Sequence, residues 1–156
     1  MSIYTLRKTQ KIPASLEDIW NFISSPKNLK TITPPYMGFD ILTENLPEKV
    51  YPGMLIEYHV SPLLGIKMKW LTEITHIEEG KYFVDEQRSG PYKIWHHEHH
   101  LEAIPNGVLM SDLINYVPPF GFLGDIAQSL FIKNQLDEIF NFRYKKLIEM
   151  YGAFPE

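Results

Sequence analysis

The residues best suited to chemistry are the histidines of the segment Trp95–His100. On a β-strand, side chains alternate between the two faces of the sheet, so His97 and His99 share one face. Trp95 and Leu101 flank them on that face, and we therefore expect it to point inward. The opposite face is mostly polar and should be hydrated; it carries Ile94, His96, Glu98, His100 and Glu102.

His97 and His99 allow more than one interpretation. The pattern His-x-His on a strand presents two imidazoles to one side, as in many zinc sites. A metal site also needs a third ligand, and the sequence offers only distant candidates, so we predict no metal and no other cofactor. Two interpretations stay open. The imidazoles are polar groups that line a ligand pocket, or they are hydrogen-bonded within a polar patch of the sheet.

A second group of polar residues lies one hairpin earlier, where Phe83, Asp85 and Gln87 share a face. If this face points inward, Asp85 can pair with a histidine, raise its pKa and form an acid/base couple. The alternative places Val84 inside the protein and leaves Asp85 and Gln87 in water. The pattern of residues 82–88 favours neither face.

A buried acid is predicted on a later strand, where Asp112 and Tyr116 point to the same side. A carboxylate buried there needs a cationic or hydrogen-bond-donating partner. Arg143 falls just inside the apolar arc of the C-terminal helix, so we predict that it forms an ion pair with Asp85, Glu86 or Asp112. The alternative is an Arg143 that extends along its apolar stem to water.

The elements that must position these residues are mainly strands. Residues 3–12 are rich in β-formers, and Ser15 and Ser25 are suited to cap two short helices that follow. From residue 39 to residue 117 the pattern is one of strands joined by hairpins, including a type I′ turn at Asn106-Gly107. Sequential hairpins predict an antiparallel meander.

The chain ends in one predicted long helix that follows a Pro/Gly elbow at residues 118–124 and reaches Tyr151. At 100° per residue, its apolar side chains cover half of the helical wheel, which suits a helix inside a curved sheet. Nine Tyr, nine Phe and three Trp also favour an aromatic-lined cavity. The apolar half carries Ile126, Leu130, Ile132, Leu136, Ile139, Phe140, Tyr144, Leu147, Ile148, Met150 and Tyr151.

The composition is that of a globular protein, with 44% apolar and 22% charged residues, and we expect one domain over residues 1–156. The net charge of −4 argues against nucleic acid, whose affinity comes mainly from Lys and Arg at phosphates. The absence of cysteine excludes disulfides and thiolate chemistry. Residues 1–10 lack the apolar stretch of a signal peptide, and no 18-residue apolar window predicts a transmembrane segment, so we expect a cytoplasmic protein.

This layout resembles the helix-grip fold of the START and birch-pollen-allergen superfamily, also called SRPBCC. The resemblance is most specific to a bacterial ligand-binding, cell-division-inhibitor-like branch. It implies an α+β fold in which a curved antiparallel sheet of six to seven strands wraps around the C-terminal helix. Three segments carry the resemblance: Phe83-x-Asp85-x-Gln87-x-x-Gly90-Pro91-Tyr92-x-x-Trp95-x-His97-x-His99-x-Leu101, Asp112-x-Ile114-x-Tyr116-x-x-Pro119-x-Gly121-x-Leu123-Gly124, and Leu130-Phe131 with Ile139-Phe140-x-Phe142-Arg143.

The resemblance implies a cavity for a small hydrophobic or aromatic molecule but no particular reaction, since one fold hosts many functions. We therefore favour a non-catalytic binding protein, in which the cavity has an apolar wall and a polar end. The predicted apolar wall consists of Met54, Ile56, Tyr58, Met68, Trp70, Phe83, Trp95, Phe140 and Tyr144. The predicted polar residues are Asp85, Gln87, His97 and His99, and Asp112 and Tyr116 are included in the predicted binding site.

Two other functions stay open. The first is an enzyme of the cyclase/dehydratase kind, in which His97 or His99 is the general base and Asp85 orients it. The second is a regulatory or structural partner that forms a homodimer through the side of the C-terminal helix that carries Phe131 and Phe142. The loop around Leu63 and Leu64 would add to that contact.

Overall fold

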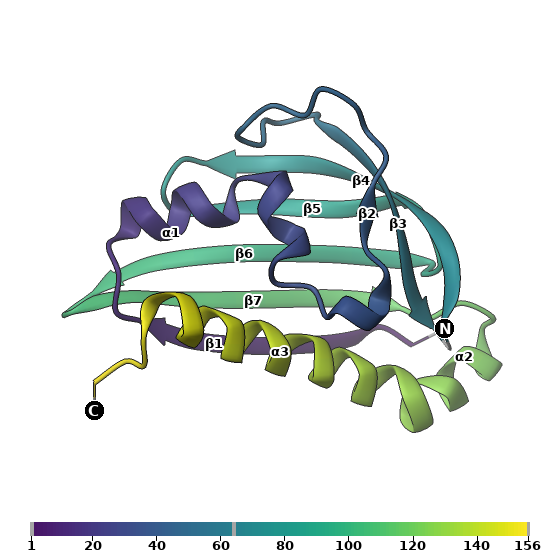
Figure 1. Ribbon diagram of the computed structural model, residues 1–156. Coiled ribbons are helices and arrows are strands. Elements are labelled where there is room, and N and C mark those ends of the chain that lie inside the picture. The colour runs from purple at the N-terminus through teal and green to yellow at the C-terminus, as the bar shows by residue number, and fades with distance from the viewer. Residues whose placement is uncertain (1, 64, 156) are drawn as a thin grey trace.

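The computed structural model of the protein describes residues 2–63 and 65–155 and has an α+β architecture (Figure 1). Seven antiparallel strands form one curved sheet in the order β1-β7-β6-β5-β4-β3-β2, and the C-terminal helix lies across one face of it. The predicted fold class is therefore confirmed. The strands are β1 (Tyr4–Ile12), β2 (Asp40–Ile41), β3 (Leu55–Leu63), β4 (Ile66–Glu78), β5 (Tyr82–Ser89), β6 (Ile94–Ile104) and β7 (Gly107–Val117).

The meander predicted for the middle of the chain is confirmed, because each strand from β2 to β7 pairs with the next along the chain. The first strand then pairs with the last, with Tyr4 opposite Tyr116 and Ile12 opposite Val108. This pairing places the two ends of the β region side by side. As a result β6 and β7, which carry most of the polar candidates, lie in the interior of the sheet rather than at its edge.

The two short helices predicted after the first strand are also present, as α1 (Leu16–Ile23) and the 3₁₀ turn η1 (Pro26–Lys30). Ser15 caps α1, since its hydroxyl accepts a hydrogen bond from the backbone N–H of Asp18 at 3.1 Å. A second 3₁₀ turn, η2 (Pro35–Met37), follows. In Figure 1 this whole segment covers the same face of the sheet as the C-terminal helix.

The C-terminal helical region differs from the prediction of one regular helix. It consists of α2 (Phe122–Ala127), a π-helical turn η3 (Gln128–Ile132) and α3 (Lys133–Tyr151). The prediction that the whole apolar half of this helix lies inside the sheet is also wrong, because Ile126, Leu130, Tyr144 and Met150 are exposed. The buried stripe is narrow because α1, η1 and η2 cover the rest of the sheet; it consists of Ile132, Leu136, Phe140, Arg143 and Leu147.

Polar contacts attach α3 to the neighbouring strand β1. The side-chain amide of Gln10 donates to the carbonyl oxygen of Tyr144 at 3.0 Å, and Lys8 forms an ion pair with Asp137 at 2.7 Å. The buried apolar stripe of α3 therefore packs against the sheet in one fixed orientation.

The tip of the β6–β7 hairpin is a second point where the sequence prediction needs correction. Ile104 pairs with Gly107, so the two turn residues are Pro105 and Asn106. Asn106 has a φ of 66°, whereas proline holds φ near −65°, so the turn is not the type I′ turn predicted from Asn-Gly. Gly107 instead begins β7, directly beside the first strand.

Gly107→Ala is expected to lower the free energy of unfolding by about 2 kcal/mol, because it overpacks a site walled by backbone. A Cβ at Gly107 would lie 2.1 Å from the carbonyl oxygen of Ile12, which can move only if β1 shifts. Urea unfolding measures the loss. Gly90→Ala is the comparison, since its Cβ would meet the side chain of Gln87, which can move away by giving up its hydrogen bonds to Tyr92. A loss at Gly107 no greater than that at Gly90 would contradict this account.

Among the described residues, no helix has both the length and the apolar character needed to cross a membrane. The predicted homodimer surface is only partly visible. Phe131 is exposed and Phe142 is half-buried, while Leu64 lies outside the described residues. The homodimer stays a prediction.

Candidate functional site

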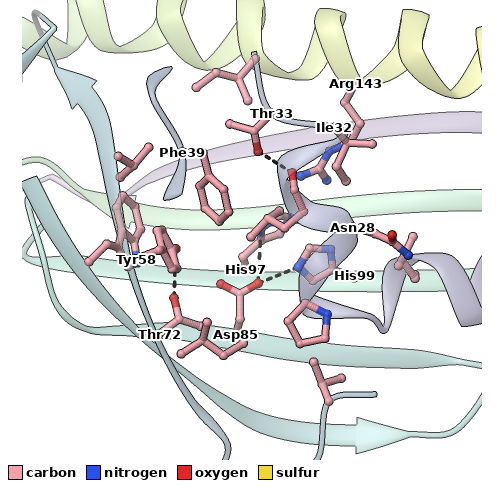
Figure 2. Close-up of a pocket in the computed structure, with 18 of the residues that line it drawn as sticks. Asn28, Ile32, Thr33, Phe39, Tyr58, Thr72, Asp85, His97, His99 and Arg143 are labelled. Carbon is pink, nitrogen blue, oxygen red and sulfur yellow. Dashed lines mark hydrogen bonds and ion pairs between the residues drawn. The ribbon is translucent and has the colours of Figure 1, made fainter. Parts of the chain in front are cut away.

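A cavity lies between the sheet, the segment from α1 to η2, and α3 (Figure 2). The volume of this cavity is about 160 Å³. Most of its wall is apolar and comes from strands β3 and β4, from α1 and η1, and from the buried stripe of α3. Its acidic and imidazole side chains come from β5 and β6, where Asp85, His97 and His99 point into it. Further polar side chains come from other elements: Ser25, Asn28, Thr33, Thr72 and Arg143.

The pairing of strands β5, β6 and β7 brings the polar residues together. Asp85 is directly opposite His97 across the β5–β6 pair, and His99 is directly opposite Asp112 across the β6–β7 pair. Side chains directly opposite each other lie on the same face of a sheet. The alternation within each strand therefore places these four side chains in one cluster on the inner face.

Each of the two imidazoles lies between two carboxylates. His99 Nε2 is 2.6 Å from Asp85 Oδ2, and its Nδ1 is 3.3 Å from Asp112 Oδ1. His97 Nε2 is 2.8 Å from Asp112 Oδ1, and its Nδ1 is 3.6 Å from Asp85 Oδ2. The two rings face each other with centroids 3.7 Å apart. The predicted pairing of Asp85 with a histidine is thus confirmed.

Arg143 completes this polar cluster from α3. Its Nη1 is 3.0 Å from Asp112 Oδ1, and both side chains are buried, which confirms the predicted ion pair and selects Asp112 from the three candidate partners. The guanidinium also lies over the ring of Phe140, with its central carbon 4.8 Å from the ring centroid. The alternative, an Arg143 that extends into water, is wrong.

The protonation of the polar cluster follows from burial and from its neighbours. Burial opposes ionisation of Asp112, but the charge of Arg143 and hydrogen bonds from His97 and His99 hold its pKa well below the usual range. Burial likewise opposes ionisation of Asp85, and a hydrogen bond from His99 lowers its pKa. Both carboxylates are therefore anionic at neutral pH.

The two imidazoles shift in opposite directions. Burial tends to lower the pKa of His99, but hydrogen bonds to Asp112 and Asp85 outweigh it and raise that pKa. Burial and the nearby charge of His99 lower the pKa of His97. A protonated His99 together with Arg143 would balance the charges of Asp85 and Asp112, which would avoid the cost of an unbalanced buried charge.

The ambiguity over the face of residues 82–88 is resolved. Phe83 and Asp85 point into the cavity, as one alternative predicted, although Val84 is buried as well. Gln87 turns away from the cavity. Its side-chain amide donates to the carbonyl of Tyr92 at 2.6 Å and accepts from the N–H of the same residue at 3.1 Å. Gln87 therefore holds the β5–β6 turn instead of contacting a ligand.

The predicted binding residues divide into two groups. Those that line the cavity are Ile56, Tyr58, Trp70, Phe83, Asp85, Trp95, His97, His99 and Phe140. Those placed outside its lining are Met54, Met68, Gln87, Asp112, Tyr116 and Tyr144.

The residues outside the lining have different environments. Asp112 lies behind the two imidazoles, and Tyr144 is exposed on α3. Tyr116 packs with other aromatic rings, including Trp95. Met54 is buried in the core, and Met68 is half-buried on β4. Met54 lies just before β3 and not in it; for the other residues the strand or helix was predicted correctly, but the neighbouring side chains could not be.

The sequence reasoning missed the part of the wall that comes from the N-terminal third of the chain. Two short helices were predicted there, with Ile19, Trp20, Phe22 and Ile23 on the apolar side of the first, but these residues were not assigned to the cavity. The hydrophobic residues of a capped helix would have been a usable signal. The missed lining residues include Phe22, Ile23, Asn28, Leu29, Ile32 and Thr33, and further along the chain Met37 and Phe39.

The prediction that a third metal ligand lies far from His97 and His99 is wrong. The structure places a ligand atom of Asp85 within 4.8 Å of one from each of His97 and His99. Among the described residues, the ligand atoms of these three side chains lie close enough together to hold one metal ion.

Solved structures share this fold at low sequence identity. The protein Ms6760 from Mycobacterium smegmatis has a TM-score of 0.66 at 16% identity, over 97% of this chain and 99% of that one. The protein CV1439 from Chromobacterium violaceum has a TM-score of 0.70 at 15% identity, over 96% and 99%. Ara h 8.0201, which is birch-pollen-allergen-like, has a TM-score of 0.57 at 14% identity, over 95% and 99%.

These similarities establish the helix-grip fold and confirm the resemblance at that level. No family model matches the chain, and no curated protein matches it. The class that fold and site define is a helix-grip protein with an internal cavity and a buried polar cluster on one wall of that cavity.

Proposed function

We propose that the protein binds a small hydrophobic or aromatic molecule in the cavity between the sheet and α3. The observation that supports this most is a mainly apolar wall that carries Asp85, His97 and His99 together on two neighbouring strands. Ligand sites of this kind gain affinity from apolar burial, at roughly 25 cal/mol per Å², and orientation from a few polar groups. A dry apolar cavity of roughly 150 Å³ is enough to hold benzene.

The polar region supports a ligand with one hydroxyl or carbonyl group at its end. Asp85 is the most accessible member of the polar cluster, with 16% of its side chain exposed against 6% for His97 and 11% for His99. A hydroxyl group that donates to Asp85 would replace solvent there. One such hydrogen bond is worth about 1 kcal/mol net, or roughly a fivefold gain in affinity.

This proposal can be tested with 2-naphthol and 2-methylnaphthalene, which have similar size and differ in one hydroxyl. We expect both to bind in an NMR titration and 2-naphthol to bind about fivefold more tightly, for the hydrogen-bond reason given above. Failure of both compounds to bind up to their solubility limits would contradict the proposal. Equal affinity for the two compounds would contradict only the assignment of Asp85 as the group that binds the hydroxyl.

Ile139→Trp is expected to weaken binding of 2-methylnaphthalene at least about tenfold, because the larger side chain fills space that the ligand needs. Ile139 lines the cavity from α3 and is half-buried, so the added ring can be accommodated without unfolding the helix. Isothermal titration calorimetry measures the change. The control is Ile148→Trp, at a half-buried position on the same helix that does not line the cavity. Equal losses in the two variants would place the ligand elsewhere.

A second function, acid/base catalysis of the cyclase/dehydratase kind, is favoured by one observation. His99 and Asp85 are 2.6 Å apart and both border the cavity, so an imidazole and a carboxylate that can exchange a proton lie together at the site. If a reaction is found, His99→Gln should lower kcat by about 10²-fold or more. Turnover unchanged in both His97→Ala and His99→Ala would remove this function.

We also propose that the protein belongs to the cell-division-inhibitor-like branch of SRPBCC and acts in the cytoplasm. The support for the branch is the sequence signature in three segments between residues 83 and 143. Fractionation of the producing cells, followed by immunodetection of the full chain, tests the location.

A further inference from the structure

We propose that Asp85, His97 and His99 bind one divalent transition-metal ion at the wall of the cavity. Two imidazole nitrogens and one carboxylate oxygen form a ligand set used for Zn²⁺ and for other first-row divalent ions. The ligand atoms of these three residues lie within 4.8 Å of one another. The inference goes beyond the proposed function, since the cavity can bind an apolar molecule whether or not a metal is present.

The first argument is the convergence of the donor atoms. His97 Nδ1 and His99 Nε2 both face Asp85 Oδ2, at 3.6 Å and 2.6 Å. In a four-coordinate zinc site with bonds of about 2.0–2.1 Å, neighbouring donor atoms lie roughly 3.3 Å apart. To reach this spacing, the distance from His97 Nδ1 to Asp85 Oδ2 must shorten and the distance from His99 Nε2 to Asp85 Oδ2 must lengthen, each by less than about 1 Å.

The second argument is the environment of the opposite ring nitrogens. His97 Nε2 and His99 Nδ1 both face Asp112 Oδ1, at 2.8 Å and 3.3 Å. A metal-binding histidine usually donates its other N–H to a carboxylate or carbonyl, which fixes the tautomer and turns the lone pair of the near nitrogen toward the metal. Asp112 can do this for both rings, so it is a positioning residue.

The third argument concerns charge and access. Arg143 balances Asp112, so the charge left at the site is that of a divalent ion and one carboxylate, with neutral imidazoles. A net charge of +1 would favour an anionic or chelating group on the ligand. Because Asp85, His97 and His99 all border the cavity, such a group can reach the ion. Three protein ligands with an open position are typical of a reactive site rather than of a structural one.

The experiment uses the full chain after removal of metal by a chelator. Titration with Co²⁺ at pH 7.5 is expected to give one ion per chain and the visible absorption of a low-symmetry site, with Zn²⁺ displacing Co²⁺. Asp85→Asn and His99→Gln should each weaken Co²⁺ binding at least about 100-fold, since each removes one of only three protein ligands. Asp112→Asn should weaken it by about 10- to 100-fold and leave the form of the absorption bands unchanged.

The matched control is the double variant His96→Gln/His100→Gln, which changes two histidines on the outer face of the same strand. It should bind Co²⁺ as the unaltered chain does. Absence of a stoichiometric site, or undiminished binding in both Asp85→Asn and His99→Gln, would overturn the proposal. An anomalous difference map from crystals grown with Zn²⁺ tests it without any variant, because a peak away from Asp85, His97 and His99 would also overturn it.

The test of the metal site can be separated from the test of ligand binding in the cavity. Binding of 2-methylnaphthalene to the chelator-treated chain reports the cavity alone, since this probe has no group that coordinates metal. Failure of Co²⁺ binding with retained binding of the hydrocarbon would remove the metal site and leave the cavity function intact.

Discussion

Arg143→Met is expected to lower the free energy of unfolding by about 3–5 kcal/mol, the range for breaking one side of a buried ion pair. The Nη1 atom of Arg143 is 3.0 Å from Asp112 Oδ1, and both side chains are more than nine-tenths buried. Methionine keeps the apolar stem but removes the positive charge that faces the carboxylate. The cost arises because Asp112 stays buried without its cationic partner. Urea unfolding at pH 7 measures the change.

Two comparisons sharpen this prediction. Lys133→Met breaks an exposed pair with Asp137 on the same helix and should cost less than about 1 kcal/mol. The double variant Arg143→Met/Asp112→Leu should be less destabilised than the sum of its single variants, because no charge is left unpaired. A loss for Arg143→Met as small as that for Lys133→Met would show that the buried pair does not contribute to stability.

The second large effect is expected in acid. A carboxyl group with a lowered pKa in the folded state binds its proton more readily after unfolding. Its contribution to stability is therefore present above the unfolded pKa of about 3.9 and is lost as the pH falls through the lower folded value. Asp112 and Asp85 both have lowered pKa values. Each proton taken up on unfolding adds about 1.4 kcal/mol per pH unit to the slope.

The imidazoles act in a separate window and with opposite signs. The raised pKa of His99 gives stability that is fully present below about pH 6.5 and is lost as the pH rises through the folded value. The lowered pKa of His97 costs stability as the pH falls below about 6.5. The two effects partly offset each other, so the acid limb below about pH 4 is expected to be the steeper part of the profile.

Asp112→Asn should make this acid limb less steep by up to about 1.4 kcal/mol per pH unit, since one proton fewer is taken up on unfolding. Urea unfolding at several pH values between 2 and 5 gives the slope. Asp137→Asn is the control. A hydrogen bond from Lys8 lowers the pKa of Asp137 as well, but solvent screens this group, and the slope should change less. Equal slopes for the unaltered chain and Asp112→Asn would contradict the assigned protonation.

The local pattern of the sequence was sufficient for much of the site. Alternation along β6 correctly separated His97 and His99 from His96 and His100, because side chains of a strand must alternate whatever the fold. The apolar neighbours then indicated which face is buried. The position of Arg143 on the helical wheel likewise predicted an ion pair with one of three acids, but it left open an Arg143 that extends to water.

Three features could not be read from local patterns. On β5, apolar and polar residues occur on both faces, so only the pairing with β4 and β6 shows that Asp85 points inward. The β4–β5 pairing includes register shifts at two places, and no pattern within either strand predicts them. The exposure of Tyr144, despite its place in the apolar arc, depends on how much of the sheet α1, η1 and η2 already cover.

The sequence by itself therefore determined the kinds of elements, their order and the inward-facing histidines. These depend on backbone periods that each segment carries alone. Only the tertiary structure decided that Asp85, His97, His99, Asp112 and Arg143 form one ion-paired cluster beside a cavity. That arrangement depends on the register of β5, β6 and β7 and on the packing of α3 against them. A shift of one residue between any two of these strands would send the side chains of one strand to the opposite face.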